Sequence, residues 1–335
     1  MIYSASAQEV PAYVYYNNLS QQTVFPESLQ SERSAAVINV SGDWKKFAAK
    51  IHEKLRLMSV DVIQYIDYND LTAGDDVTAP IVAYLNKRNV KFIITFSVNE
   101  EGLFEMNISD MENFLKSGKH PATRFTNSDP DGLLRYVANE LIRAELNNDN
   151  FLIPEKPEFL LDIDMVKGRK FNVHARDVAT LKLAVPRFQK ISDEVIATSN
   201  DQGLLKAYNR KMDNWNKELE AMMLKFPYKF ELVNTTDATE LYRQGFQFVL
   251  LPVTTRGISI KKMLNIAVDD SETEFISHGP ADSLIRIDVE DIVTKFYIKQ
   301  LYTKDLYVGD KWDADVTWQK ALDNFLFNYR AFVKK

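Results

Sequence analysis

The sequence of 335 residues contains no cysteine and only 11 glycines, and both shortages exclude whole classes of protein. Without cysteine, the chain forms no disulfide, no iron–sulfur cluster and no thiolate-ligated zinc site, and it offers no lipobox anchor. Glycine falls to about half of its usual share of roughly 7%. Few positions can therefore adopt positive φ or let a ligand approach the backbone closely.

The spacing of the glycines excludes the common phosphate-binding loops. Gly245 and Gly257 form the closest pair, and they lie 12 residues apart. The motifs G-x-G-x-x-G and G-x-x-x-x-G-K-[ST] both need closer glycines, and so does the G-x-S-x-G turn of α/β-hydrolases. The sequence therefore belongs to none of the families that carry these signatures.

Histidine, positive charge and long apolar runs are also scarce. The 4 histidines show no metal-binding spacing, so we expect neither a metal nor another cofactor. The net charge of −6 argues against nucleic acid as a partner, because nucleic-acid-binding domains usually present a basic face. No apolar run approaches the roughly 20 residues of a membrane-spanning helix, and we expect no transmembrane segment.

The residues that are abundant predict a folded α/β protein of more than one unit. Hydrophobic residues make up 45% of the chain, and its length is about twice that of a usual domain. Residues 34–40 read as a strand, and the next residues show the apolar stripe of a helix that Asp43 caps. The almost continuous apolar run at 92–96 is typical of a strand covered on both faces.

The second half of the sequence repeats this order of elements. Residues 241–248 match residues 85–92 position by position with an offset of 156, and the apolar run at 248–251 follows as 92–94 does. Asn214-Trp215 resembles Asp43-Trp44, which predicts a helix start there. We therefore predict a mixed α/β sheet in two tandem repeats, each with the order strand-helix-strand-helix-strand-strand-helix.

These patterns divide the chain into four segments. We expect an N-terminal segment at 1–33, a first repeat at 34–150, a connector at 151–200 and a second repeat at 201–335. The second repeat ends in an amphipathic helix from about Asp313, whose apolar stripe follows helical spacing. The stripe consists of Trp318, Leu322, Phe325, Leu326 and Tyr329.

The first residues carry a possible export signal. Ala5-Ser6-Ala7, followed by Gln8, fits the small-x-small pattern before a signal-peptidase cut, so residues 1–7 read as the remnant of a signal peptide. The other interpretation is a chance Ala-x-Ala in a frayed terminus, which leaves a cytoplasmic protein.

Two groups of residues in the connector are candidate sites. Asp162 and Asp164 share one face of a predicted strand, and paired carboxylates can share acid–base work. Together with His174 they form the possible site of a hydrolase between the repeats. The plainer interpretation is a polar strand face. Basic residues follow directly and could hold a phosphate or a polysaccharide carboxylate, although solvated charge in a connector is the simpler interpretation. These are Lys167, Arg169, Lys170 and Arg176.

The order of elements resembles that of the amino-terminal α/β domain of TolB, and it is similar to related envelope domains such as the curli-secretion lipoprotein family. The segment Lys91-Phe92-Ile93-Ile94-Thr95-Phe96 stands where that group has its buried strand. The resemblance covers residues 34–146 and again 204–305, has no residue motif and carries over no functional residue. It implies an interaction module of the cell envelope.

We therefore expect a non-enzymatic, exported and periplasmic protein that binds an envelope protein or polysaccharide. The hydrolase with Asp162, Asp164 and His174 is the alternative. A deep pocket that joins those groups would favour the enzyme, and a solvated polar face would favour the binding module.

Overall fold

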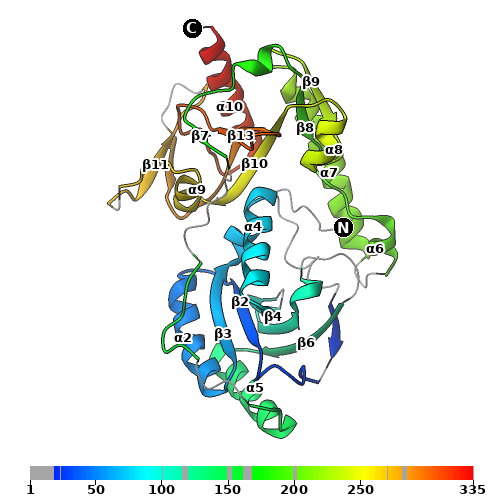
Figure 1. Cartoon of the computed structure of the whole chain (residues 1–335), viewed down its shortest axis with the longest axis vertical. Coiled ribbons are helices and arrows are strands. Elements are labelled where there is room, and N and C mark those ends of the chain that lie inside the picture. The colour runs from blue at the N-terminus through cyan, green and yellow to red at the C-terminus, as the bar shows by residue number, and fades with distance from the viewer. Residues whose placement is uncertain are drawn as a thin grey trace.

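The computed structural model describes residues 19–22, 24–99, 101–114, 120–148, 153–160, 168–198, 202–269, 271–280 and 285–334. Two α/β units are stacked along the long axis of the molecule, the first below and the second above in Figure 1. Each unit contains a six-stranded sheet with both parallel and antiparallel neighbours. The predicted α/β class with mixed sheets is thus confirmed.

The first unit extends from β1 to α5. Its strands are β1 (Leu19–Gln22), β2 (Arg33–Asn39), β3 (Asp61–Asp67), β4 (Val90–Val98), β5 (Phe104–Asp110) and β6 (His120–Asn127). Its helices are α2 (Trp44–Leu57), α3 (Tyr68–Leu71), α4 (Asp75–Lys87), the 3-10 turn η1 (Met111–Asn113) and α5 (Pro130–Ala144). The strand order is β1-β6-β5-β4-β2-β3, in which β2 is parallel to both β3 and β4.

The second unit extends from β7 to α10. Its main strands are β7 (Lys170–Phe171), β8 (Leu183–Pro186), β9 (Phe230–Val233), β10 (Phe248–Arg256), β13 (Ile292–Gln300) and β14 (Leu306–Tyr307). β11 (Glu274–Ser277) and β12 (Ile285–Asp288) form a separate hairpin. Its helices are η2 (Asp177–Ala179), α6 (Asp193–Thr198), α7 (Gln202–Met223), α8 (Ala238–Arg243), α9 (Gly257–Met263) and α10 (Trp318–Val333).

The two large sheets have the same strand order and the same strand directions. The strand order of the second sheet is β7-β14-β13-β10-β8-β9. In this sheet β8 lies between β9 and β10 and is parallel to both, as β2 lies between β3 and β4 in the first sheet. In each sheet a short preceding strand, β1 or β7, pairs in parallel with the last strand. The match is one of topology, and whether it arose by duplication stays a prediction.

The predicted offset of 156 coincides with a shared backbone conformation. Asn89 and Gly245 both have positive φ, 58° and 87° respectively, in the turn between a helix and the central buried strand. Glycine adopts this conformation without cost and asparagine tolerates it, so both residues can end a helix in the same way.

Three predicted boundaries differ from the structure. The predicted connector at 151–200 contributes β7 and β8, so the second sheet begins before residue 201. These strands are only two and four residues long, too short for alternation to be visible. Asn214-Trp215 lies inside α7, which begins at Gln202 and has no capping residue at 214. The terminal helix begins at Trp318, later than the predicted start near Asp313, and Thr317 caps it.

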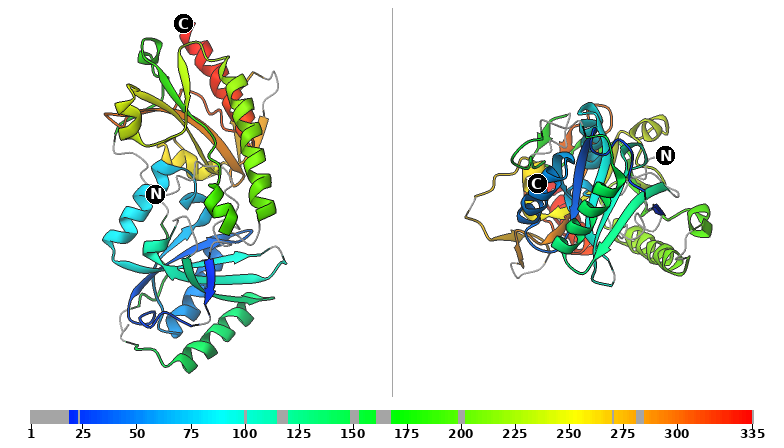
Figure 2. Two further views of the ribbon diagram at one scale, coloured as in Figure 1. Left: turned by 90° about the vertical axis from the view of Figure 1, so that its right-hand side faces the viewer. Right: turned by 90° about the horizontal axis from the view of Figure 1, so that it is seen from below.

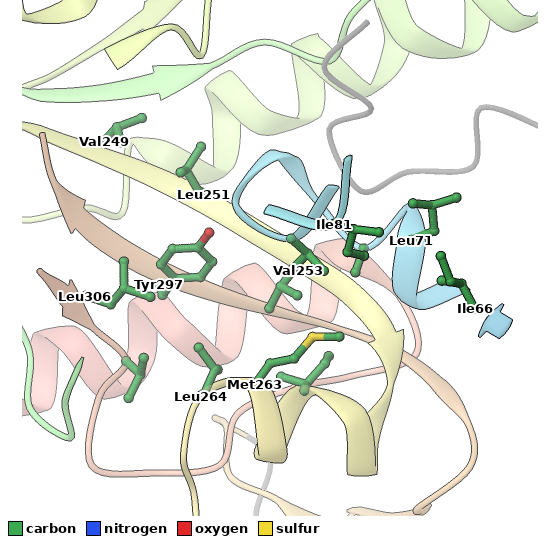
Figure 3. Close-up of a cluster of buried hydrophobic side chains, with 14 of the residues drawn as sticks. Ile66, Leu71, Ile81, Val249, Leu251, Val253, Met263, Leu264, Tyr297 and Leu306 are labelled. Atoms are coloured by element: carbon green, nitrogen blue, oxygen red, sulfur yellow. The ribbon is translucent and has the colours of Figure 1, made fainter. Parts of the chain in front are cut away.

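Three apolar clusters hold the two units. One lies between the first sheet and helices α2 and α5, and a second lies between the second sheet and helices α7 and α10. The third contains side chains of both units, among them Leu71 and Ile81 from the first and Val253 and Tyr297 from the second (Figure 3). The turn from α3 into α4, here called the acidic corner (residues 67–76), thus packs against β10 of the second unit.

The segment after α5 returns along the outer edge of the first sheet. The backbone N–H of Tyr65 in β3 donates to the carbonyl of Glu158 at 2.8 Å, and Leu160 donates to the carbonyl of Tyr65 at 2.9 Å. The ring of Phe159 meets Trp44 edge-to-face at 5.6 Å. This segment, residues 153–160, covers the edge of β3 before the chain crosses to the second unit. None of the helices in the described part of the chain has the length and apolar composition needed to cross a membrane.

Candidate functional site

The basic residues of the predicted connector lie at one edge of the second sheet. Arg169 precedes β7, the outermost strand, and its side chain is 77% exposed. Its guanidinium lies 5.2 Å from the centre of the Phe171 ring, and that ring stacks on Tyr307 at 5.2 Å with an angle of 20°. We call this surface the basic edge (Arg169, Lys170, Phe171, Arg176 and Tyr307).

Asp305 fixes the start of the basic edge. Its Oδ1 accepts a hydrogen bond of 2.7 Å from the backbone N–H of Arg169, and its Oδ2 lies 3.3 Å from the guanidinium. Burial favours the neutral acid, but the hydrogen bonds from Arg169 and Thr303 lower the pKa of Asp305 overall. The chain approaches so closely that a Cβ on Gly168 would lie 2.4 Å from the carbonyl carbon of Lys304. Glycine is therefore required there.

The structure brings only part of the predicted anion site together. Arg169 and Lys170 lie at the start of β7, and Arg176 lies further along, with its guanidinium 5.2 Å from the Phe332 ring. Lys167 lies outside the described residues. Both arginines rest on aromatic rings, which holds flat, charged donors at the surface with little loss of side-chain freedom.

His174 is enclosed by aromatic rings. Its side chain is 2% exposed, and the ring centres of Phe325, Tyr329 and Phe332 lie 5.6, 4.9 and 5.4 Å away. Burial, and secondarily the charge of Lys295, lowers the pKa of His174 to about 4. Within the described ranges neither ring nitrogen has a hydrogen-bond partner. Asp162 and Asp164 lie outside those ranges, so the predicted catalytic group is represented by His174 alone.

A second polar cluster, which sequence reasoning missed, joins the units at the acidic corner. Asp70 accepts a hydrogen bond of 2.6 Å from Thr255, and Asp75 accepts one of 2.7 Å from Thr236. Asp76 accepts a hydrogen bond of 2.8 Å from the Tyr297 hydroxyl. Asp67 pairs with Arg256 and Asp76 also pairs with Lys299. Four carboxylates of the first unit thus receive donors from the second.

Burial raises the pKa values of two of these carboxyls. For Asp70 desolvation is the largest cause, opposed by the hydrogen bonds from Thr255 and Ser259. For Asp75 desolvation is again the largest cause, opposed by the Thr236 hydrogen bond and reinforced by the neighbouring charge of Asp76. Groups with raised pKa values in a cleft are candidates for acid–base work, but structural networks have the same effect.

The cavity beside Asp75 tests those two interpretations for that carboxyl. Its volume is about 30 Å³, which holds roughly two water molecules. It is lined by residues of both units, including Gly74, Asp75, Arg187, Thr236 and Tyr297, and His174 is not among them. The space is far smaller than the roughly 300–1,000 Å³ of a ligand pocket. This volume favours a structural role for Asp75, and the donors that the second unit supplies to all four carboxylates favour the same role for the acidic corner as a whole.

A buried ion pair lies in the second unit. The Nζ of Lys295 is 2.5 Å from Oδ1 of Asp313, and the side chains are 0% and 1% exposed. Desolvation raises the pKa of Asp313, and the charge and hydrogen bond of Lys295 oppose that shift. The described residues contain no group of three or more histidine, aspartate or glutamate side chains that could hold a metal ion.

The contacts at the basic edge and at the acidic corner could not be predicted from the sequence, because the residues that form them are far apart in it. Asp305 follows Arg169 by 136 positions, and the acidic corner meets donors of the second unit that lie at least 161 positions later. No family model, curated protein or solved structure matches the chain.

Proposed function

We propose that this protein is a non-enzymatic binding module of the cell envelope, exported to the periplasm, which binds an acidic polysaccharide through the basic edge. The observation that carries the proposal is the stack of the Arg169 guanidinium on Phe171 and of Phe171 on Tyr307. A fixed guanidinium donates paired hydrogen bonds to a carboxylate, and an aromatic face packs against the C–H groups of a sugar ring.

The geometry of the other candidates supports binding rather than catalysis. His174 has no access to solvent, and its lowered pKa results mainly from that enclosure. The cavity beside Asp75 admits water but no sugar or peptide. These observations weigh against the alternative hydrolase built from Asp162, Asp164 and His174.

The test measures binding of the full chain to a soluble polyuronate, with an uncharged polysaccharide of similar length as the control ligand. Arg169→Gln removes the charge but keeps a polar side chain, and we expect affinity to fall about tenfold, the effect of losing one charge-assisted hydrogen bond. Binding should also weaken with added salt. Arg243→Gln, at an exposed position on α8, is the matched control. Equal binding by the two variants, or equal binding of the uncharged polymer, would refute the proposal.

The proposed location has a separate test. Cell fractionation followed by sequencing of the mature N-terminus should find the chain in the periplasm, with cleavage after Ala7. An intact Met1 on a cytoplasmic protein would contradict export and leave the polysaccharide measurement unaffected.

A further inference from the structure

The two large sheets differ at the edges formed by β3 and β9 in the described part of the chain, since an extended segment pairs with β3. In the first unit the segment 153–160 covers β3, with two backbone hydrogen bonds to Tyr65 and a parallel bridge between Tyr65 and Phe159. An uncovered edge strand presents free N–H and C=O groups that can pair with another chain. The first unit therefore shows how this fold closes that edge with an extended segment.

β9 is the strand of the second unit that occupies the same place. Tyr65 pairs with Ala36 in β2, and Leu232 pairs with Val185 in β8. Phe92 and Phe248 are related by the offset of 156, and they pair with Ser34 and Leu183. Ala36 lies two residues after Ser34, and Val185 lies two residues after Leu183. By register, Leu232 is thus the counterpart of Tyr65.

The backbone of β9 points its free groups away from the sheet at Phe230 and Leu232. Lys229 and Val233 accept hydrogen bonds from β8 and from Arg187, which follows β8, at 3.1 and 2.8 Å. Because groups alternate along a strand, those of Phe230 and Leu232 face outward. In the described part of the chain, no segment donates to or accepts from them. In Figure 1, β9 lies at the outer margin of the second unit.

We infer that β9 binds an extended segment of a partner protein as an added parallel strand, and that this segment carries an acidic residue followed by apolar residues. The segment Glu158-Phe159-Leu160 of the first unit is the precedent for both features. There, the carboxylate of Glu158 lies 3.5 Å from the guanidinium of Arg88, and the next two residues are apolar.

The side chains around β9 fit such a segment. Tyr228, Phe230 and Leu232 are half-buried and lie on the edge of the apolar cluster under α7. An added apolar side chain would complete their cover, as Phe159 does beside Trp44. By the same register the acidic residue would lie opposite Glu231, whose carboxylate already pairs with Lys182. The exposed Lys229, two residues before Glu231 on the same face of the strand, would be the cation for that acidic residue. Backbone pairing would supply affinity and these side chains would supply specificity.

This surface is separate from the basic edge. β7 and β9 are the two opposite margins of the second sheet. The inference adds a protein partner to the proposed binding function. It rests on the proposal that this protein is a binding module, but not on the proposal that it binds a polysaccharide. The peptide measurement below uses no polysaccharide, so failure of one proposal is distinguishable from failure of the other.

The experiment uses the full chain and a capped peptide with the sequence of residues 153–160. We expect saturable binding, with slowed amide hydrogen exchange at Phe230 and Leu232. Leu232→Pro removes an outward N–H that the sheet does not use, and affinity should fall at least tenfold, whereas Leu232→Val should bind as the original chain does. A peptide methylated on the backbone nitrogen at the Leu160 position tests the other expected hydrogen bond, from the peptide to the carbonyl of Leu232, without changing the protein. It should also bind at least tenfold more weakly.

Four results would overturn the inference. The first is no saturable binding at millimolar peptide, and the second is equal binding by the methylated peptide. The third is a change in exchange at Tyr65 rather than Leu232, which means that the peptide displaces the segment already on β3. The fourth is concentration-dependent self-association that protects Leu232, which assigns β9 to a second copy of this chain.

Discussion

The hydroxyl of Tyr297 donates a hydrogen bond of 2.8 Å to Oδ2 of Asp76, although the two residues lie 221 positions apart. Lys299 pairs with the other oxygen of the same carboxylate. Asp76 lies in the first turn of α4, where the helix dipole also favours negative charge. One carboxylate thus joins α4 of the first unit to β13 of the second (Figure 2 shows the two units from the side).

The first prediction concerns this contact. Asp76→Ala should lower the free energy of unfolding by about 1–3 kcal/mol, because it leaves the buried hydroxyl of Tyr297 and the partly buried ammonium of Lys299 without their acceptor. Tyr297→Phe should cost less, because Asp76 keeps Lys299. Urea unfolding of both single variants and the double variant measures the coupling between the two residues. Additive losses would contradict a direct contact.

The second prediction concerns pH and His174. Its pKa is about 4 in the folded chain against a usual value of 6.5, so the unfolded chain binds more protons between these limits. The contribution of neutral His174 to the free energy of unfolding should therefore be fully present above pH 6.5. It should be lost, by roughly 3 kcal/mol, as the pH drops to about 4.

Substitution isolates this effect from other titrating groups. His174→Gln should remove that part of the pH dependence, whereas His278→Gln, at an exposed position, should keep it. Chemical denaturation at several pH values measures the slope. Identical slopes for the two variants would show that His174 is already protonatable in the folded protein.

The third prediction concerns Gly309, which packs against the enclosed histidine. Its φ is +80°, and a Cβ added there would lie 2.9 Å from Cε1 of His174. Gly102→Ala is the matched control, because Gly102 has a φ of +77° and open space around it. Both variants should lose about 1 kcal/mol from backbone strain, and Gly309→Ala should lose a further 1–3 kcal/mol or so from crowding. Equal melting temperatures would mean that the ring moves aside freely.

The fourth prediction concerns the buried pair of Lys295 and Asp313. Lys295→Met alone should destabilise the chain by about 3–5 kcal/mol, because it leaves a carboxylate buried without its partner. Adding Asp313→Asn removes that charge and should recover a large part of the loss. If the double variant is less stable than the single one, the carboxylate is neutralised by another group.

Local patterns predicted the elements but not the contacts between them. The apolar stripe of the last helix is buried as expected, and the continuous run in β4 is covered on both faces, since burial dictates both patterns. β7 and β8 were missed because strands of two and four residues show no period. β1 lies inside the predicted N-terminal segment at 1–33, for which no strand was predicted.

The site was predictable only where residues are close in sequence. Arg169, Lys170 and Phe171 are adjacent, so their shared surface followed from composition. The acidic corner did not, because Asp70 meets Thr255 across 185 positions and each residue alone looks like an ordinary polar surface residue. For His174 the sequence was misleading, because a histidine near two carboxylates in the sequence suggests catalysis. In the fold its side chain is surrounded by aromatic rings of α10, which are distant in sequence.

The apolar cluster shared by the two sheets has a consequence for the autonomy of each unit. Leu71 and Val77 in the first unit and Val253 in the second belong to one cluster, and a chain divided between α5 and β7 would split that cluster. Such a division would leave two fragments that each lack part of their own interior. We therefore expect the two units to unfold together rather than as independent domains.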